Sequence, residues 1–300
     1  MPRETTRESL KVPREAAGER LDRWLAGALS VPLARARALV ADQRVRIRGK
    51  RCAITRRLFG GEEVVVERHA PRAAPAPAGG PGSSLAVLHD DADCLVVAKP
   101  AGLAVQPAGP HAPSVATAVA GLGRFDVEGR ALPGFPHRLD RDTTGTLLLA
   151  RHDRALAALR AAFEAGQVEK EYLALVQGVP PDEGRLDTAY GRDPADPRRF
   201  TTRVASARRA RLAFRVERRL GGGALLRVVL DTGRTHQIRV QLAEAGYPVI
   251  GDAVYGVASP VISRQALHAE RLAFPAPSGA RVDVRAPWPE DLVAAVAGMG

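Results

Sequence analysis

The hydrophobic positions of this chain follow a period of two in some stretches and a helical period in others. Between residues 44 and 48, Val45 and Ile47 alternate with three arginines, which predicts a strand with one buried face. Apolar runs bounded by turn residues predict further strands at 85–89, 94–98 and 146–150.

Helical periodicity predicts helices at 21–29 and 32–41, and later at 151–166 and 235–245. In the third of these, Leu156, Leu159 and Phe163 recur at helical spacing, and Gly166 can end the helix. Beyond residue 85, strands outnumber helices and do not alternate strictly with them. This order predicts an α+β domain built on a mixed, mainly antiparallel sheet.

Residues 69–84 separate two regions with different patterns. They contain four prolines, three glycines and no large apolar side chain, which predicts an extended linker. We therefore expect a small N-terminal α/β module at 1–68, a linker at 69–84 and a larger domain at 85–300.

Composition narrows the class of protein. Three hundred residues with 45% hydrophobic content can bury a sizeable core. The chain shows no secretory signal core and no apolar stretch of the roughly 18 residues that a membrane helix needs, so we expect a cytoplasmic protein without a membrane partner. Cys52 and Cys94 lie far apart and have no ligand spacing, so neither a disulfide scaffold nor a metal site is expected.

The net charge of +11 suggests a polyanionic partner, because lysines and arginines that neutralise phosphates release condensed counterions. Between Arg35 and Arg57 there are nine basic residues and one acid, Asp42. Such a cluster can form a phosphate-binding surface. The alternatives are a solvated strand face and a general preference for arginine in the genome.

The run from His137 to Gly145, HRLDRDTTG, presents Asp140 among basic residues on a turn before a strand. A carboxylate placed there can act as a nucleophile, a general base or a charge anchor. To stay ionised in a dry pocket it needs a permanent positive partner. Arg138 and the segment 230–239 offer one, and in that segment His236 and Arg239 are expected on one helix face. The alternative for the segment is a surface ion pair at a helix start.

Residues 18–68 resemble the S4 RNA-binding domain. The resemblance depends on the sequence ERLDRWLA and, after it, ARARALVADQRVRIRGK. It implies contacts with the backbone of structured RNA by the basic residues on the matching helix and turn, namely Arg35, Arg37, Arg44, Arg46 and Lys50.

Residues 85–292 resemble the RluA class of RNA pseudouridine synthases. The resemblance depends on four blocks in order, at 95–103, 137–145, 170–178 and 232–256, with a weaker block at 267–269. It implies that the N-glycosidic bond of a uridine in RNA is broken and the ribose rejoined to carbon 5 of the uracil, without a cofactor or metal.

The same resemblance implies roles for individual residues. Asp140 matches the essential aspartate, which acts at the ribose or at the uracil. Tyr172 matches a tyrosine that lies against the target base and is implicated in removing the proton from carbon 5. Arg239 matches the arginine paired with the aspartate, and Arg138 the residue that fills the stack after the target nucleotide flips out. Further substrate contacts are expected from His137, Lys99, Arg234, His236 and Leu267, although His137 can equally be structural.

We expect a monomeric enzyme that acts on RNA, with large-subunit ribosomal RNA favoured, because members with this N-terminal module resemble the ribosomal enzymes. Three alternatives stay open. The substrate can be transfer RNA, the chain can be a noncatalytic RNA-binding or ribosome-assembly factor, or it can hydrolyse a glycosidic bond with Asp142 as the second carboxylate.

Overall fold

The computed structural model describes residues 5–69 apart from 30, 32 and 42, residues 85–107 and residues 112–300. Nearly all of the predicted linker at 69–84 lies outside these described residues. Within them, no helix is long and apolar enough to cross a membrane.

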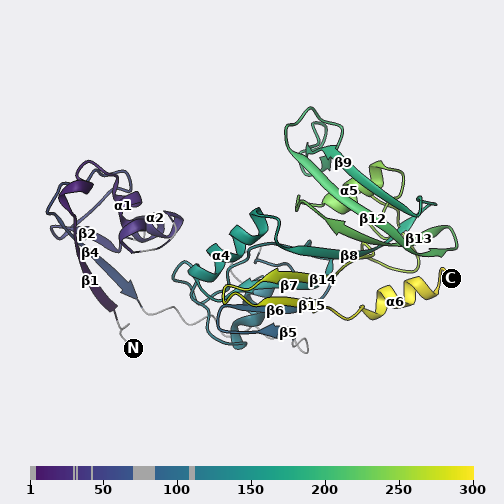
Figure 1. Cartoon of the computed structure of the whole chain (residues 1–300), viewed down its shortest axis with the longest axis horizontal. Coiled ribbons are helices and arrows are strands. Elements are labelled where there is room, and N and C mark those ends of the chain that lie inside the picture. Colours follow the sequence, from purple (N-terminus) through teal and green to yellow (C-terminus); the bar gives the residue numbers. More distant parts are fainter. Residues whose placement is uncertain (1–4, 30, 32, 42, 70–84, 108–111) are drawn as a thin grey trace.

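The N-terminal residues form a four-stranded antiparallel sheet with two α-helices and one short 3-10 helix (Figure 1). The strands lie in the order β1 (Thr5–Lys11), β4 (Glu63–His69), β2 (Val45–Ile47) and β3 (Lys50–Arg51). The helices are α1 (Leu21–Ala28), α2 (Leu33–Ala41) and a short 3-10 helix η1 (Arg14–Ala16). Val45 and Ile47 are buried, as their alternation predicts.

The remaining residues form a nine-stranded sheet, which confirms the predicted fold class. Its only parallel pair among the described strands is β7 with β14. The order is β5 (Ala86–Asp90), β6 (Cys94–Lys99), β7 (Thr144–Ala150), β14 (Leu267–Pro275), β8 (Glu169–Gln177), β13 (Gly223–Leu230), β12 (Arg209–Leu220) and β9 (Glu183–Ala189), and β15 (Arg281–Arg285) pairs with β14.

The predicted helices at 151–166 and 235–245 correspond to α4 (Asp153–Glu164) and α5 (Gln237–Glu244). Gly166 has a φ of 69°, the left-handed conformation expected just after a helix end. Two further helices, α3 (Val115–Ala118) and α6 (Glu290–Ala297), were not predicted, and neither was the 3-10 helix η2 (Val119–Gly121). A separate small hairpin pairs β10 (Gly191–Arg192) with β11 (Phe200–Thr201).

Strand β7 is buried on both faces, which accounts for its uninterrupted apolar run from Leu147 to Leu149. At its start, Gly145 has a φ of 118°, and a Cβ there would lie 2.1 Å from the carbonyl oxygen of Ala269 on β14. Only glycine permits this close approach. The charged turn at 137–143 is therefore fixed to the centre of the sheet.

Candidate active site

The turn that carries Asp140 is held by cations from distant parts of the chain. Lys99 Nζ donates to the carbonyl oxygen of Arg141 at 2.6 Å, and Arg264 Nη1 donates to that of Asp142 at 3.1 Å. The amide of Thr143 closes the turn by donating to the Asp140 carbonyl at 3.2 Å. Leu139 is buried beside the acid. The Asp140 side chain, 19% exposed, is thus presented from a turn anchored on both sides.

Arg239 joins Asp140 to a second, fully buried carboxylate. Its Nη1 donates to Asp140 Oδ2 at 2.9 Å. Its Nε and Nη2 donate to the two oxygens of Asp252 at 2.6 and 2.8 Å. The amides of Val254 and Tyr255 also donate to Asp252. Two of the three hydrogen-bonding nitrogens of Arg239 therefore fix its orientation, and the third binds the candidate reacting group.

The protonation of this network follows from its burial and pairing. Burial opposes the charge on both Arg239 and Asp252, but their mutual hydrogen bonds outweigh it. The pKa of Arg239 is therefore raised and that of Asp252 lowered. Both groups are charged at neutral pH, so Asp140 faces a permanent cation.

His236 lies at the start of α5 and not on its face, which corrects the predicted helical pairing with Arg239. It is the N-cap residue, with a φ of 59°. Its Nε2 lies 3.8 Å from Asp140 Oδ1. Burial lowers the pKa of His236, which leaves the imidazole neutral at neutral pH. After it, Gln237 Oε1 accepts hydrogen bonds from the amide of Arg234 and the hydroxyl of Thr232, which fix the turn that precedes His236.

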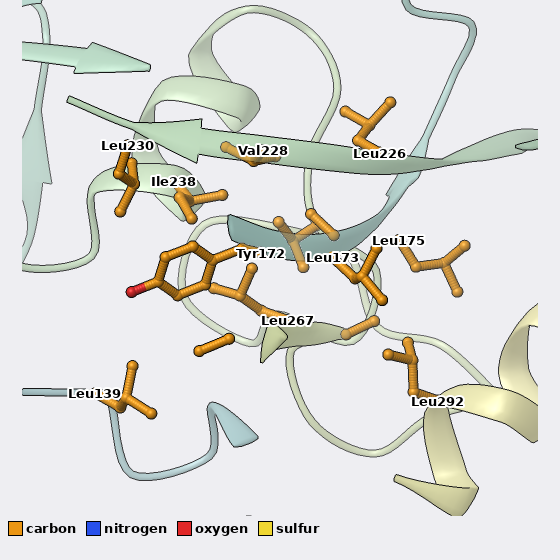
Figure 2. Packing of buried hydrophobic residues seen from close by; sticks show 14 of the residues in the cluster. Leu139, Tyr172, Leu173, Leu175, Leu226, Val228, Leu230, Ile238, Leu267 and Leu292 are labelled. Carbon is orange, nitrogen blue, oxygen red and sulfur yellow. The ribbon is translucent and has the colours of Figure 1, made fainter. Parts of the chain in front are cut away.

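Tyr172 extends from β8 toward Asp140. Its ring is 8% exposed and packs in the main hydrophobic core. Figure 2 shows its hydroxyl pointing away from Leu173 and Leu175, toward the space between Leu139 and Leu230. Burial and the charge of Asp140 raise the pKa of Tyr172, so its hydroxyl is protonated at neutral pH.

Asp140, Tyr172, His236 and Arg239 line one pocket of about 60 Å³. Of the sequence-predicted residues, it contains Arg138, Asp140, Tyr172, Arg234, His236, Arg239 and Leu267. Residues that sequence reasoning missed also line it, namely Leu139, Thr143, Leu230, Gln237 and Ile238. Asp252 and Tyr255 were missed too, although both lie in the fourth motif block, where a lone acid in an otherwise apolar stretch was the available signal.

The structure does not bring His137 or Lys99 into the pocket. His137 Nε2 accepts a hydrogen bond from the amide of Leu148 at 2.9 Å, and its ring stacks on Phe163. Burial lowers the pKa of His137 to about 3, so it is a neutral structural residue. Burial likewise lowers the pKa of Lys99 to about 8, and its three hydrogen bonds all go to backbone carbonyls. In this structure both residues hold the backbone, and their expected substrate contacts stay predictions.

The basic residues of the N-terminal module that were predicted to bind RNA differ in solvent exposure and in ion pairing. Lys50 is exposed, and Arg46 is half-buried with Glu67 at 4.0 Å. Arg37 is exposed but pairs with the buried carboxylate of Asp22 at 2.9 Å. Arg44 is partly buried, and the Arg35 side chain lies outside the described residues.

In the part of the chain that the structure describes, one group could hold a metal ion. His89, Asp91 and Cys94 place their ligand atoms within 4.8 Å of one another at the turn between β5 and β6. None of them lines the Asp140 pocket. His89 and Cys94 both hydrogen-bond to Asp91 in this structure, which accounts for the grouping without an ion.

The pairing of Arg239 with Asp140, in a pocket that also contains Tyr172, is the arrangement that the motif blocks imply. Residues 93–244 match the family model of RNA pseudouridylate synthase. The chain belongs to this family and is an RNA pseudouridine synthase, which confirms the resemblance at the level of the family.

Two relatives and one solved structure illustrate the similarity. The chain is 39% identical to an RNA pseudouridine synthase of Chloroflexus aurantiacus, over 94% of this chain and 90% of the relative. It is 33% identical to the ribosomal large subunit pseudouridine synthase D of Pseudomonas aeruginosa, over 94% of this chain and 92% of the relative. The structure of human RNA pseudouridylate synthase domain containing 1 is 27% identical, with a TM-score of 0.56 over 70% of this chain and 87% of that chain.

Proposed function

We propose that the protein converts specific uridines of large-subunit ribosomal RNA into pseudouridine, with Asp140 as the reacting group. The observation that carries this proposal is the contact of 2.9 Å between Asp140 and Arg239 in a pocket that also contains Tyr172. The ribosomal substrate is supported by the name of the relative from Pseudomonas aeruginosa.

In this proposal the two oxygens of Asp140 have different tasks. Oδ2 is held by Arg239. Oδ1 accepts no hydrogen bond from the described residues and is free to react with the ribose or the uracil as nucleophile or base. Since Tyr172 stays protonated, it can take the proton from carbon 5 only while its own hydroxyl proton passes to a base, and the carboxylate of Asp140, whose charge raises the pKa of Tyr172, is the base that the pocket offers. Arg138, which is exposed at the pocket, fills the stack that the flipped nucleotide leaves.

Release of tritium from RNA labelled at carbon 5 of uridine tests the function. We expect release from transcripts of large-subunit ribosomal RNA and none from transfer RNA. Release from transfer RNA alone would assign the other substrate. Free uracil with abasic sites, instead of pseudouridine, would show that the bond is hydrolysed and the proposal wrong.

We also propose that residues 1–68 are an S4-like RNA-binding module, joined by 69–84 to the catalytic domain at 85–300. The module's own hydrophobic core, made of residues between Val12 and Val66, supports this division. Its surface supports RNA binding, because Arg46 of β2 lies directly opposite Arg51 of β3. Like charges in that position destabilise a strand pair, and among the described residues only Glu67, 4.0 Å from Arg46, offers the two arginines a carboxylate.

Replacing Arg44, Arg46 and Lys50 together with alanine should weaken RNA binding and flatten its salt dependence. Each lost phosphate contact lowers the slope of log affinity against log salt by roughly 0.7–0.9, so we expect a decrease of about 2. Filter binding at four salt concentrations measures it. The matched control replaces Lys11, Arg14 and Arg23, exposed basic residues of the same module. Equal slopes for the two triple variants would rule out this surface as an RNA contact.

A further inference from the structure

We propose that the hairpin at 191–208, here called the arginine hairpin, binds the RNA backbone on either side of the nucleotide in the pocket. This proposal rests on the proposed function and adds a second RNA contact, next to the reacting group. The hairpin contains β10 and β11 and carries five arginines, all exposed, against two aspartates. The five are Arg192, Arg198, Arg199, Arg203 and Arg208.

The arginine hairpin is fixed against the wall of the Asp140 pocket. The ring of Phe200 lies edge-on to His236 at 5.9 Å, and its amide donates to the Tyr255 hydroxyl at 3.0 Å. The hydroxyl of Thr201 and the amide of Thr202 donate to the carboxylate of Glu244 on α5. A surface anchored in this way moves with the pocket and can set the position of a bound strand relative to Asp140.

The charges of the arginine hairpin are largely unneutralised. Among the described residues, only Arg198 has a carboxylate within 4.0 Å, that of Asp196. Two arginines in the main sheet of the same domain, one on β14 and one on β13, are paired instead. Arg271 pairs with Glu169, Glu171 and Asp283, and Arg227 pairs with Glu171, Glu217 and Glu270. The arginine hairpin therefore carries an excess of positive charge beside the pocket, and this charge favours the binding of an anionic partner.

Two of these guanidinium groups are already oriented by aromatic rings. Arg192 lies 5.0 Å from the centroid of Phe200, and Arg199 lies 5.2 Å from that of Tyr255. Stacking restricts both side chains. Arg192 Nη1 also donates to the carbonyl oxygen of Pro197, and the remaining donors are available to a planar or tetrahedral anion. The uridine in the pocket belongs to an RNA strand, so the phosphates on both sides of it lie at the mouth of the pocket, beside the arginine hairpin. RNA phosphate is therefore the anion that the position favours.

The test replaces Arg192, Arg203 and Arg208 with glutamine in a full-length chain that also carries Asp140→Asn. Binding is then measured apart from turnover, on a transcript of large-subunit ribosomal RNA. The salt slope of binding should fall by about 2, at roughly 0.7–0.9 per phosphate contact. The control replaces Arg154, Arg160 and Arg218, exposed arginines elsewhere in the domain, and should change the slope by less than one contact.

With Asp140 restored, the hairpin variant should show a raised KM and an unchanged kcat. A salt slope equal to that of the parent overturns the proposal. A reduced slope in a chain that releases no tritium from any RNA would uphold the surface and refute the proposed function, so the two failures are distinguishable.

A different set of contacts leads to a second inference, that Tyr255 is a positioning residue which directs a proton of His236 toward Asp140. The Tyr255 hydroxyl accepts the amide hydrogen of Phe200, so its own hydrogen is free to point at His236 Nδ1, 3.0 Å away. An imidazole that accepts at Nδ1 carries its proton on Nε2. That atom lies 3.8 Å from Asp140 Oδ1. The Tyr255 ring also lies 5.2 Å from the guanidinium of Arg239.

Tyr255→Phe separates these two contacts, because it keeps the ring beneath Arg239 and removes only the hydroxyl. We expect kcat to fall by about tenfold, the effect of the lost hydrogen bond to His236, and any rise in KM reports the loss of the hydrogen bond from the Phe200 amide, which helps to anchor the arginine hairpin. Nitrogen NMR of His236 should show the proton redistributed between the two ring nitrogens. Tyr247→Phe, at a partly buried tyrosine of the core, serves as control. An unchanged kcat together with an unchanged tautomer would overturn the inference.

Discussion

Asp140→Asn should abolish pseudouridine formation, with a loss of turnover of at least about 10⁴-fold, the scale seen when a nucleophile or its base is removed. The amide keeps the size of the carboxylate and can still accept a hydrogen bond from Arg239. It cannot attack as an anion or take up a proton. Single-turnover tritium release measures the loss, and filter binding should give an RNA affinity within about twofold of the parent, because charge-based phosphate contacts elsewhere are untouched.

Asp142→Asn is the matched control for this variant. Asp142 lies two residues further along the same turn, and its carboxylate accepts a hydrogen bond from the amide of Gly102 at 3.2 Å. It does not line the pocket. We expect its turnover to stay within a few-fold of the parent. Measurable isomerisation by Asp140→Asn, or equal losses in the two variants, would contradict the assignment of Asp140 as the reacting group.

Arg239→Gln should lower both the stability of the fold and the rate of turnover. It leaves the fully buried Asp252 without its cation, which typically costs about 3–5 kcal/mol of folding free energy. It also removes the hydrogen bond to Asp140, so turnover should fall by at least about 10²-fold even in the folded fraction. Urea unfolding followed by circular dichroism gives the stability, and tritium release under native conditions gives the activity.

Adding Asp252→Asn to Arg239→Gln separates the two effects. The double variant removes both members of the buried pair, so much of the stability should return while activity stays low. The parent should also lose stability in acid. Since the pKa of Asp252 is lowered in the folded state, its contribution is complete above the ordinary value of about 3.9 and is lost as the pH falls through the folded value. Full recovery of activity in the double variant would show that Arg239 acts only through stability.

The strands and long helices could be predicted because their periodicity is local. Strand β7 and helix α4 are read from the spacing of leucines within a few residues. Strand β1 could not, because its residues include a single large apolar side chain, Leu10, and its conformation depends on pairing with β4. Helix α6 was missed, although it has apolar residues at helical spacing and the same eight-residue length as α1 and α5, which were predicted. Short amphipathic segments of this kind depend on the surface that they cover.

The candidate site shows the same division between local and distant information. Motif order pointed to Asp140, Tyr172 and Arg239, and the structure brings all three to one pocket. Charge pattern alone could not show that Arg239 would turn two of its nitrogens toward Asp252, 13 residues further on. Nor could it show that His137, next to Arg138, would face the core and bind the backbone of Leu148. Neighbouring residues on a turn can point to opposite sides, and only tertiary packing decides which.

The anchoring of the Asp140 turn also has a consequence for synthesis of the chain. The residues that hold the turn lie far along the sequence. Arg239 follows Asp140 by 99 residues, and Arg264, which binds the Asp142 carbonyl, follows Asp142 by 122 residues. Just after the turn, Thr144 contacts His268, which is 124 residues further on. Contacts this distant in sequence form only after the intervening chain is available. A nascent chain on the ribosome therefore carries the reacting aspartate long before it has a working pocket. The enzyme becomes competent only when β14 has emerged and docked beside β7.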